Sequence, residues 1–360
     1  MRAGILWQVV LIAQLLTLAS AQQHKDAPET ETLRYYADKL GIGIGSAIQG
    51  RYWDADPQLR KVVGTEFSRA VSITPMKFTE PEPDHFDFAS MDRDIAFAKE
   101  HQMRLFGTPI IYRNDEAAPW LRFNPFFCGG WSPDALGQVL KKFVQALVRH
   151  GGETYFAWEL VNEPTAPGNN RCWSRVLGYE EAIATVFRYA REASPNALLL
   201  INDTYGHAGV DRDRADNFLS LVKRLKSQGV PIDAVGTEMH LQLQQLHPNY
   251  VDEFKYFLEA ARKLGVQVHI TELDVYQGPP GAFADPWAKQ KEVFYNIVHT
   301  CVQDTNCSSI TIFGTSDKYT WLRNDDELQN PAPLLFDDKY NKKPAYYGVL
   351  QALKDGRKPN

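Results

Sequence analysis

Two glutamates stand at the ends of apolar segments, where a side chain would leave a hydrophobic interior. The run of residues 155–161 leads into Asn162 and Glu163, and the run of residues 266–270 leads toward Glu272. Two carboxylic acids that face one cleft can hydrolyse a glycosidic bond, because one protonates the leaving oxygen while the other attacks or activates water. A solvated loop carboxylate or an ion-pair partner is the alternative for either residue alone. We predict that Glu163 and Glu272 form a catalytic pair at a common opening.

Short apolar runs alternate with helical patterns along the chain. The clearest helix is expected to begin at Pro133 with Ser132 as its N-cap, because apolar residues then recur on one face. Apolar strands separated by helices predict a parallel sheet covered on both faces, and eight such units close into a (β/α)8 TIM barrel more readily than into an open sheet. Chemistry in such a barrel lies at the carboxyl ends of the strands, which is where Glu163 and Glu272 stand. The expected strands are residues 41–48, 70–74, 105–111, 156–161, 198–202, 234–240, 266–275 and 310–314, and the other expected helices are residues 91–99, 179–193, 213–227, 251–264 and 287–300.

The composition excludes several classes of protein. The 360 residues are 44% hydrophobic and 23% charged, a balance typical of a globular domain rather than of a disordered or fibrous chain. There are 39 basic and 44 acidic residues without a block of like charge, which argues against nucleic acid or an anionic membrane as partner. Because no repeat or linker interrupts the chain, we expect one barrel domain over residues 32–360, preceded by a flexible segment at 22–31, and a monomer.

The first 21 residues have the pattern of a signal peptide. Arg2 precedes an apolar stretch at residues 5–18, which is followed by small residues ending at Ala21. A membrane anchor is the alternative, but Gln8 and Gln14 interrupt the stretch, which is short for a span of about 20 residues. We therefore predict cleavage after Ala21 and an extracellular, secreted protein.

The predicted extracellular location affects the interpretation of the four cysteines. They are even in number and contain no CxxC pair, so two disulfides are favoured over metal ligands in an oxidising compartment. Cys301 and Cys307 would close a short loop, which leaves Cys128 with Cys172 if all four pair. The sequence leaves the other pairings open.

Motifs around both glutamates resemble those of glycoside hydrolase family 10, the retaining endo-1,4-β-xylanases. The resemblance runs over most of the chain after residue 21 and extends to its closing segments and to a short disulfide loop like that at Cys301 and Cys307. The motifs that carry it are WELVNEP at 158–164, ITELD at 270–274, GTSDKYTW at 314–321, LFD at 335–337 and KPAY at 343–346.

The resemblance implies a role for each residue around the predicted pair. Glu163 would act as general acid and then base, and Glu272 as the nucleophile that forms a glycosyl-enzyme. Asn162 would hydrogen-bond the sugar 2-hydroxyl. His240 would support Glu272, with Asp274 orienting the imidazole ring.

Three further residues are expected to bind substrate. Lys77 matches a sugar-binding lysine of the family, Trp321 matches a wall against which a sugar face can stack, and Tyr205 is a weaker candidate. For an aromatic residue the alternative is a place in the core.

The sequence also departs from the family at positions that would contact sugar or surround the catalytic pair. Glu238 replaces a neutral glutamine, and crowded carboxyls raise the proton affinity of at least one of them, so we expect a coupled group to shape the pH profile. Missing sugar-binding groups should weaken xylanase specificity. The other changed positions are Ile73, Thr74, Thr108, Tyr112, Arg113 and Phe313.

A metal site and two glycosylation sequons are the remaining motifs. His269 and Glu272 form an HxxE pattern near His240, but residues 269 and 272 of a strand point to opposite faces, so we predict neither metal nor other cofactor. Of the two sequons, Asn306 lies in an expected loop, whereas Asn202 ends an expected barrel strand and is predicted to be buried or in the cleft.

Three functions follow from these observations. The first is endo-1,4-β-xylanase activity on xylan or a related plant polysaccharide. The second keeps the chemistry but acts on a plant glycoconjugate, like the tomatine-degrading enzymes of the same family. The third is a carbohydrate-binding barrel without turnover, against which the retained glutamate pair argues.

Overall fold

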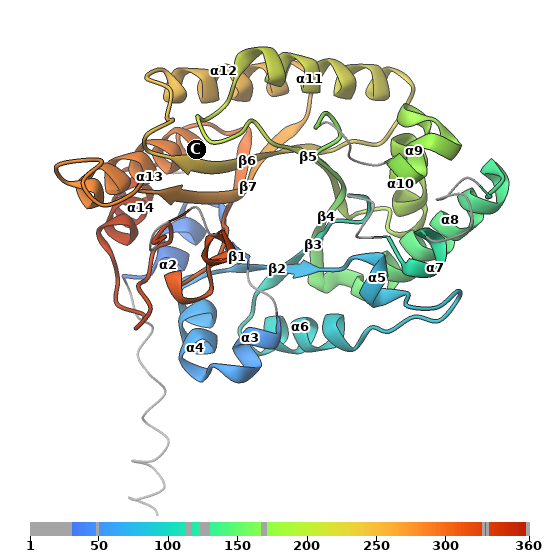
Figure 1. Ribbon diagram of the computed structural model, residues 1–360, viewed down its shortest axis with the longest axis horizontal. Helices are drawn as coiled ribbons and strands as arrows, with labels where there is room; N and C mark the ends of the chain where they lie inside the picture. Colours follow the sequence, from blue (N-terminus) through green and yellow to red (C-terminus); the bar gives the residue numbers. More distant parts are fainter. Residues whose placement is uncertain are drawn as a thin grey trace, which may run out of the picture.

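Eight parallel strands close into a barrel in the computed structural model, which describes residues 31–47, 50–112, 117–122, 130–166, 171–325, 328 and 331–357. Each strand pairs with the next in sequence order, and β8 returns to pair with β1 (Figure 1). The strands are β1 Gly43–Ala47, β2 Arg69–Ile73, β3 Arg104–Thr108, β4 Tyr155–Asn162, β5 Leu198–Asp203, β6 Ala234–Gln242, β7 Gln267–Tyr276 and β8 Cys307–Ile312. The predicted (β/α)8 TIM barrel is confirmed, and all eight expected strands are present with shifted ends.

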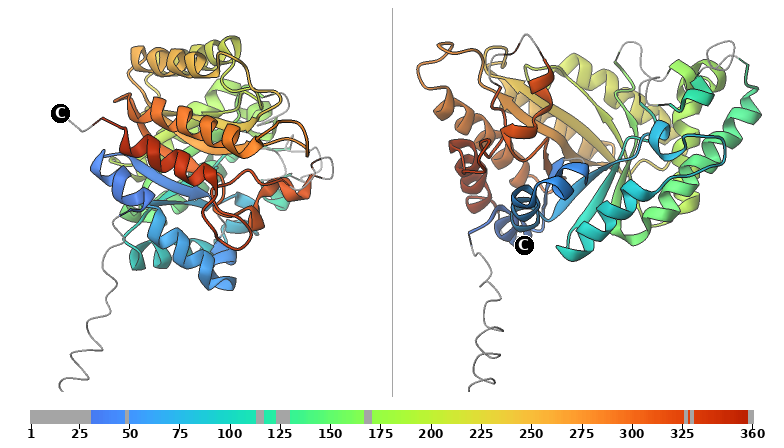
Figure 2. Two further views of the ribbon diagram at one scale, coloured as in Figure 1. Left: turned by 90° about the vertical axis from the view of Figure 1, so that its left-hand side faces the viewer. Right: turned by 60° about the horizontal axis from the view of Figure 1, so that its bottom comes forward.

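Helices cover the outside of the strands, as the turned views in Figure 2 show. The α-helices are α2 Leu33–Lys39, α3 Gly50–Ala55, α4 Pro57–Glu66, α5 Met76–Thr79, α6 Ala89–Glu100, α7 Pro119–Arg122, α8 Pro133–Gly151, α9 Arg171–Leu177, α10 Tyr179–Ala193, α11 Arg212–Ser227, α12 Tyr250–Lys263, α13 Pro286–Val302 and α14 Pro344–Lys354. Short 3₁₀ turns are η2 Gly152–Thr154, η3 Asp317–Tyr319 and η4 Trp321–Asn324.

Local signals explain where the helices begin. Ser132 accepts a hydrogen bond from the N–H of Ala135 at 3.2 Å, and Pro133 occupies the first turn of α8, as predicted. The sequence analysis missed α4, which begins in the same way with Asp56 as cap and Pro57 in its first turn. Its apolar stripe is weaker, because only Leu59, Val63 and Glu66 of its ten residues are buried.

The barrel interior below the mouth is filled by apolar side chains. Val71, Phe106, Ala157, Leu200 and Ala234 form one buried cluster from five neighbouring strands. Side chains alternate between the two faces of a strand, so residues two positions further along point to the same interior, one layer nearer the mouth. In that next layer Thr108, Glu159 and Asn202 are polar, and the candidate site lies there.

Some predictions fall on residues that the structure does not describe. The predicted signal peptide, most of the segment at 22–31, Cys128 and the side chain of Cys172 are outside the described residues, so the Cys128–Cys172 pairing stays a prediction. Cys301 and Cys307 are disulfide-bonded and join the end of α13 to the start of β8. No helix in the described ranges combines the length and the apolar character needed to cross a membrane.

Candidate active site

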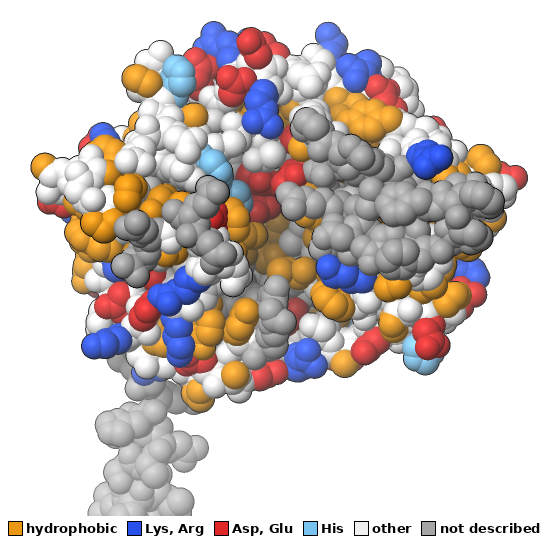
Figure 3. All heavy atoms as spheres, in the orientation of Figure 1, with side chains coloured by type: hydrophobic (Ala, Val, Ile, Leu, Met, Phe, Trp, Pro, Cys, Tyr) orange, Lys and Arg blue, Asp and Glu red, His pale blue; other side chains and the backbone are white. Residues whose placement is uncertain are grey.

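The carboxyl ends of β4, β6 and β7 bring Glu163, Glu238 and Glu272 to the mouth of the barrel. Figure 3 shows a hollow there, in which acidic side chains lie beside a histidine and above a hydrophobic floor. Bulges interrupt the pairing of β7 with both of its neighbours at this level, between Thr237 and Glu238 on one side and between Ile270 and Leu273 on the other. A bulge re-aims side chains, which explains how neighbouring strand ends converge on one point.

Glu163 is fixed from two directions. It follows β4 with a backbone φ of +47°, a left-handed conformation that is uncommon for residues other than glycine. Its N–H donates to the carbonyl of Asn202 at the end of β5 at 2.9 Å, which anchors this turn to the sheet. The hydroxyl of Tyr112 donates to Glu163 Oε1 at 3.0 Å. The strained backbone and the hydroxyl together set the direction of the carboxyl group.

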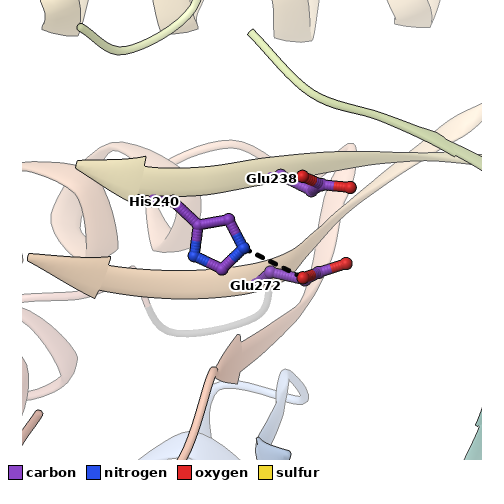
Figure 4. Close-up of side chains that lie close together, drawn as sticks. All are labelled: Glu238, His240 and Glu272. Carbon is purple, nitrogen blue, oxygen red and sulfur yellow. Dashed lines mark hydrogen bonds and ion pairs between the residues drawn. The ribbon is translucent and has the colours of Figure 1, made fainter. Parts of the chain in front are cut away.

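His240 lies between two carboxylates. Its Nε2 is 3.0 Å from Glu272 Oε2, the contact drawn in Figure 4, and its Nδ1 is 3.0 Å from Asp274 Oδ2. Burial disfavours the charged ring, but Asp274 and Glu272 outweigh it and raise the pKa of His240 well above its usual range. The imidazolium therefore donates to both carboxylates and places a positive charge against Glu272.

Trp321 closes this row of side chains. Its indole Nε1 donates to Asp274 Oδ2 at 2.8 Å, and its ring centroid is 5.0 Å from that of His240. The side chain is still 41% exposed at the mouth. Trp321 thus has an open aromatic surface whose orientation is fixed from below.

The side chain of Asn202 connects Glu238 with Glu272. The sequence analysis noted Asn202 only as a glycosylation sequon. Its Nδ2 donates to Asn162 Oδ1 at 2.8 Å, to Glu238 Oε1 at 3.1 Å and to Glu272 Oε1 at 3.3 Å. Its Oδ1 accepts from Thr271 Oγ1 at 2.7 Å. The residue is fully buried, as one of the predicted alternatives held, so a glycan cannot reach it. Only its place at the end of an apolar strand could have signalled this role.

Two buried carboxyls crowd Glu272. Burial, followed by the charge of Glu272, raises the pKa of Glu238 well above its usual range, while His240 opposes this effect. The same two causes, in the same order, raise the pKa of Glu159 in β4, which the sequence analysis did not single out. Glu159 Oε1 is buried without a hydrogen-bond partner among the described residues. Glu238 and Glu159 therefore keep their protons to higher pH than exposed glutamates do.

The remaining sequence predictions have mixed outcomes in the structure. Lys77 lies in α5, directly after β2, with its ammonium 5.1 Å from the ring centroid of Phe78. Tyr205 is only 4% exposed and packs edge-on against Phe257, so neither face of its ring is open to a sugar. The prediction that Tyr205 binds substrate is wrong, because the chain beyond β5 turns this ring into the core.

Comparison with known proteins decides the family. The sequence profile of Glycosyl hydrolase family 10 matches residues 32–352. The chain belongs to this family. It is 30% identical over 356 residues to endo-1,4-β-xylanase B of Thermotoga neapolitana, covering 96% of this chain and 97% of that protein. It is 32% identical over 279 residues to endo-1,4-β-xylanase A of Humicola insolens, covering 77% and 71% respectively.

Solved structures of family 10 members show the same barrel. The crystal structure of native xylanase 10B from Thermotoga maritima has a TM-score of 0.81 and 30% identity, covering 90% of this chain and 98% of that one. Xylanase 10B from Thermotoga petrophila, solved in complex with xylobiose, has a TM-score of 0.81 and 29% identity, covering 90% and 97%. This protein is therefore a glycoside hydrolase by family.

The structure shows which departures from the family 10 pattern reach the cleft. Ile73 at the end of β2 is 36% exposed, whereas Thr74 is fully buried with its N–H bonded to the carbonyl of Thr108 at 3.0 Å. Tyr112 contacts Glu163, and the ring of Phe313 lies edge-on to His240 at 5.0 Å. Tyr112 thus contacts a member of the glutamate pair and Phe313 contacts the histidine beside it, while Ile73 adds an apolar side chain at the end of β2.

A metal ion is a poor fit to this family 10 site. Within the described ranges, ligand atoms of Glu238, His240 and Glu272 lie within 4.8 Å of one another. However, both ring nitrogens of His240 already lie 3.0 Å from carboxylate oxygens, so a cation would have to displace one of these contacts. His269 packs against Phe156 below the site, and burial lowers its pKa to about 3. The arrangement favours proton chemistry, and our expectation that no metal is needed stays a prediction.

Replacing Glu238 with glutamine should narrow the pH range of activity on its alkaline side. In the wild type, a second negative charge develops near Glu272 and Glu163 as the pH rises through the raised pKa of Glu238, and a negative charge favours retention of the proton that Glu163 donates in the reaction. Glutamine has the same shape but does not titrate, so the alkaline limb of kcat/KM should move downward, by up to about one pH unit. Initial rates measured from pH 3 to 10 test this expectation. Superimposable profiles would show that Glu238 does not influence the reaction.

Proposed function

We propose that this protein is a secreted retaining glycoside hydrolase that cleaves β-1,4 bonds of xylan or of a related plant cell-wall polysaccharide. The observation that carries the proposal is the pair of Glu163 and Glu272 at one mouth, with His240 and Asn202 both bonded to Glu272. We further propose that it acts as a monomer and needs no cofactor, since acid and nucleophile are both side chains of this chain.

Glu163 supplies the proton in the first step. Because the Tyr112 hydroxyl donates to Oε1, the carboxylic proton belongs on Oε2, from which it passes to the glycosidic oxygen. In the second step the ionised Glu163 accepts a proton from the attacking water. Glu163 alternates between its protonated and ionised forms, so its carboxyl group must keep the same direction in both. The anchored left-handed turn at Glu163 provides that direction.

Glu272 attacks the anomeric carbon and forms the glycosyl-enzyme. Donors from His240 and Asn202 hold its two oxygens in place before the reaction, which lowers the cost of orientation. Asn162 holds its own amide oxygen against Asn202, so its amide nitrogen is the group positioned toward the sugar 2-hydroxyl. Such a bond strengthens as charge develops on the sugar ring.

The pattern of the first 21 residues and the disulfide support the proposal of secretion. The proposed signal peptide would be cleaved after Ala21, and the Cys301–Cys307 disulfide suits an oxidising compartment. Mass spectrometry of the secreted protein should find Gln22 as the first residue. An uncleaved amino terminus would contradict this part of the proposal.

Ile73 favours a second candidate substrate, a plant glycoconjugate. An apolar side chain in the cleft cannot hydrogen-bond a sugar hydroxyl, so a glycoside with an apolar group, as in a plant glycoconjugate, is the alternative substrate. A panel of xylan, xylo-oligosaccharides, aryl β-glycosides and glycosylated saponins distinguishes the two. The xylan proposal expects the highest kcat/KM on xylan or on xylo-oligosaccharides.

Ile73→Glu should raise turnover of xylo-oligosaccharides if the cleft is an altered xylose site. A carboxylate that bonds a sugar hydroxyl contributes about tenfold or more in kcat/KM. Ile73→Leu is the matched control, because it keeps the position apolar. High xylan activity of the wild type that the glutamate does not improve would show that other residues supply these contacts.

A further inference from the structure

A second open groove is lined by residues that follow the last two strands of the barrel. Residues 285–287 at the start of α13 and residues of the long segment between β8 and α14 enclose a volume of about 1260 Å³. Both segments follow the carboxyl ends of strands, β7 and β8, and α13 and α14 lie side by side (Figures 1 and 2). Neither Glu163 nor Glu272 lines this groove. It is therefore separate from the catalytic mouth.

The turn η4 separates the groove from the catalytic mouth. Trp321, its first residue, bonds Asp274 in the active site. Arg323, two residues later, lines the groove, where its Nε donates to the carbonyl of Asp317 at 2.7 Å and its terminal nitrogen donates to both carboxylate oxygens of Asp338 at 2.6 Å. One short turn thus presents a side chain to each site.

Trp287 provides an aromatic surface in the groove. It is 41% exposed, although it is large and apolar. The ammonium of the buried Lys343 lies 5.1 Å from its ring centroid and is itself held by Asp317 Oδ2 and the carbonyl of Ala332, each at 2.7 Å. A buried ion pair therefore supports the indole, and the exposed part of the ring remains available to a ligand.

The charges of the groove select the kind of ligand. Asp285, Asp337 and Asp338 are balanced by Arg323, Lys339 and Lys342 among the described residues that line it. A site with this balance does not concentrate anions or cations. Arg323 is bonded to Asp338, and Lys342 is paired with Glu66, which leaves Asp285 Oδ2 and the Lys339 ammonium of the described lining to bond hydroxyls. The exposed indole of Trp287 offers an apolar face to the C–H face of a sugar ring.

We propose that this groove is an accessory binding site for a neutral β-1,4-linked polysaccharide, with one sugar ring stacked on Trp287. The choice of ligand rests on the proposed function, in which the substrate is a long chain that extends beyond the catalytic cleft. The groove holds part of that chain, which raises the local concentration of cleavable bonds at the mouth. A short soluble glycoside gains nothing from it, because such a ligand does not reach past η4.

Trp287→Ala tests the proposal in two backgrounds. In the full-length Glu272→Ala chain, affinity electrophoresis in soluble xylan should show binding weakened about three- to tenfold by loss of the indole. In the active enzyme, kcat/KM on xylan should fall by a similar factor, while kcat/KM on an aryl β-xylobioside stays unchanged. Tyr347→Ala is the control, because Tyr347 is a 49% exposed aromatic on α14 that does not line the groove.

The outcomes separate this proposal from the proposed function. Turnover of the aryl glycoside reports the catalytic pair alone. The proposal of an accessory site is contradicted if Trp287→Ala binds xylan as tightly as its parent, or if the Tyr347→Ala control loses as much affinity. It is also contradicted if the parent Glu272→Ala chain does not bind xylan. Trp287→Phe, which keeps an aromatic ring and disturbs the surface less, should retain most of the affinity. If the phenylalanine variant binds as weakly as the alanine variant, stacking is not the cause.

Discussion

Glu272→Ala is expected to abolish turnover of every glycoside, with kcat reduced on the order of 10⁴-fold or more. The variant removes the carboxylate that would form the glycosyl-enzyme, and neither Glu238 nor Glu159 can replace it. Both of these groups are buried, and burial, the first cause of their raised pKa values, remains in the variant and disfavours the charged form that a nucleophile needs. Initial rates on an aryl β-xylobioside and on xylan measure the loss.

Glu259→Ala is the matched control for this loss. Glu259 lies on the exposed side of α12, where it pairs with Lys263 at 2.8 Å, and its removal should leave both rates unchanged. Both variants should fold, since Glu272 makes its hydrogen bonds to His240 and Asn202 at the mouth rather than in the hydrophobic core, and Glu259 lies on the surface. Appreciable aryl-glycoside turnover by the folded Glu272→Ala protein would contradict the assignment of the nucleophile.

Glu163→Ala is expected to separate substrates by their leaving groups. Without an acid, turnover of xylan should fall about 10²- to 10⁴-fold, because its leaving alcohol must be protonated. The leaving group of a dinitrophenyl glycoside departs as dinitrophenolate and needs no proton. Formation of the glycosyl-enzyme from this substrate should therefore be nearly unaffected. Rates on both substrates with the wild type and the variant measure this difference.

Azide provides a second test of Glu163. A small anion needs no general base, so it can enter the space left by the carboxyl and attack the glycosyl-enzyme. It should restore part of the rate and yield a glycosyl azide of retained configuration. If Glu163→Ala loses both substrates equally and azide does not help, Glu163 is not the acid and base.

The positions of the two glutamates could be predicted because the signal is local. Glu163 and Glu272 stand at the ends of apolar runs, and the carboxyl ends of parallel strands must meet at one end of a barrel. His240 and Asp274 depended on the family resemblance, since sequence patterns alone do not say which histidine of a barrel reaches which carboxylate.

The contacts that complete the site could not be predicted, because they depend on lateral register. Asn202 bonds Glu238 and Glu272 where a bulge in β7 shifts its pairing with β6, and a bulge cannot be read from the apolar pattern of a strand. Tyr112 contacts Glu163, but these residues belong to separate segments of the chain, and no sequence pattern indicates that the two segments meet. The wrong prediction for Tyr205 has the same origin, since its position after β5 left the direction of the side chain undetermined.

The stereochemistry of the first product tests the central claim most directly. If Glu272 forms a covalent intermediate and water then displaces it, two inversions at the anomeric carbon give net retention. Proton NMR during hydrolysis of a β-linked xylo-oligosaccharide should therefore show the β-anomer of the new reducing end first, with the α-anomer appearing later by mutarotation. An α-anomer that forms first would show direct attack by water and would contradict the role of Glu272 as nucleophile.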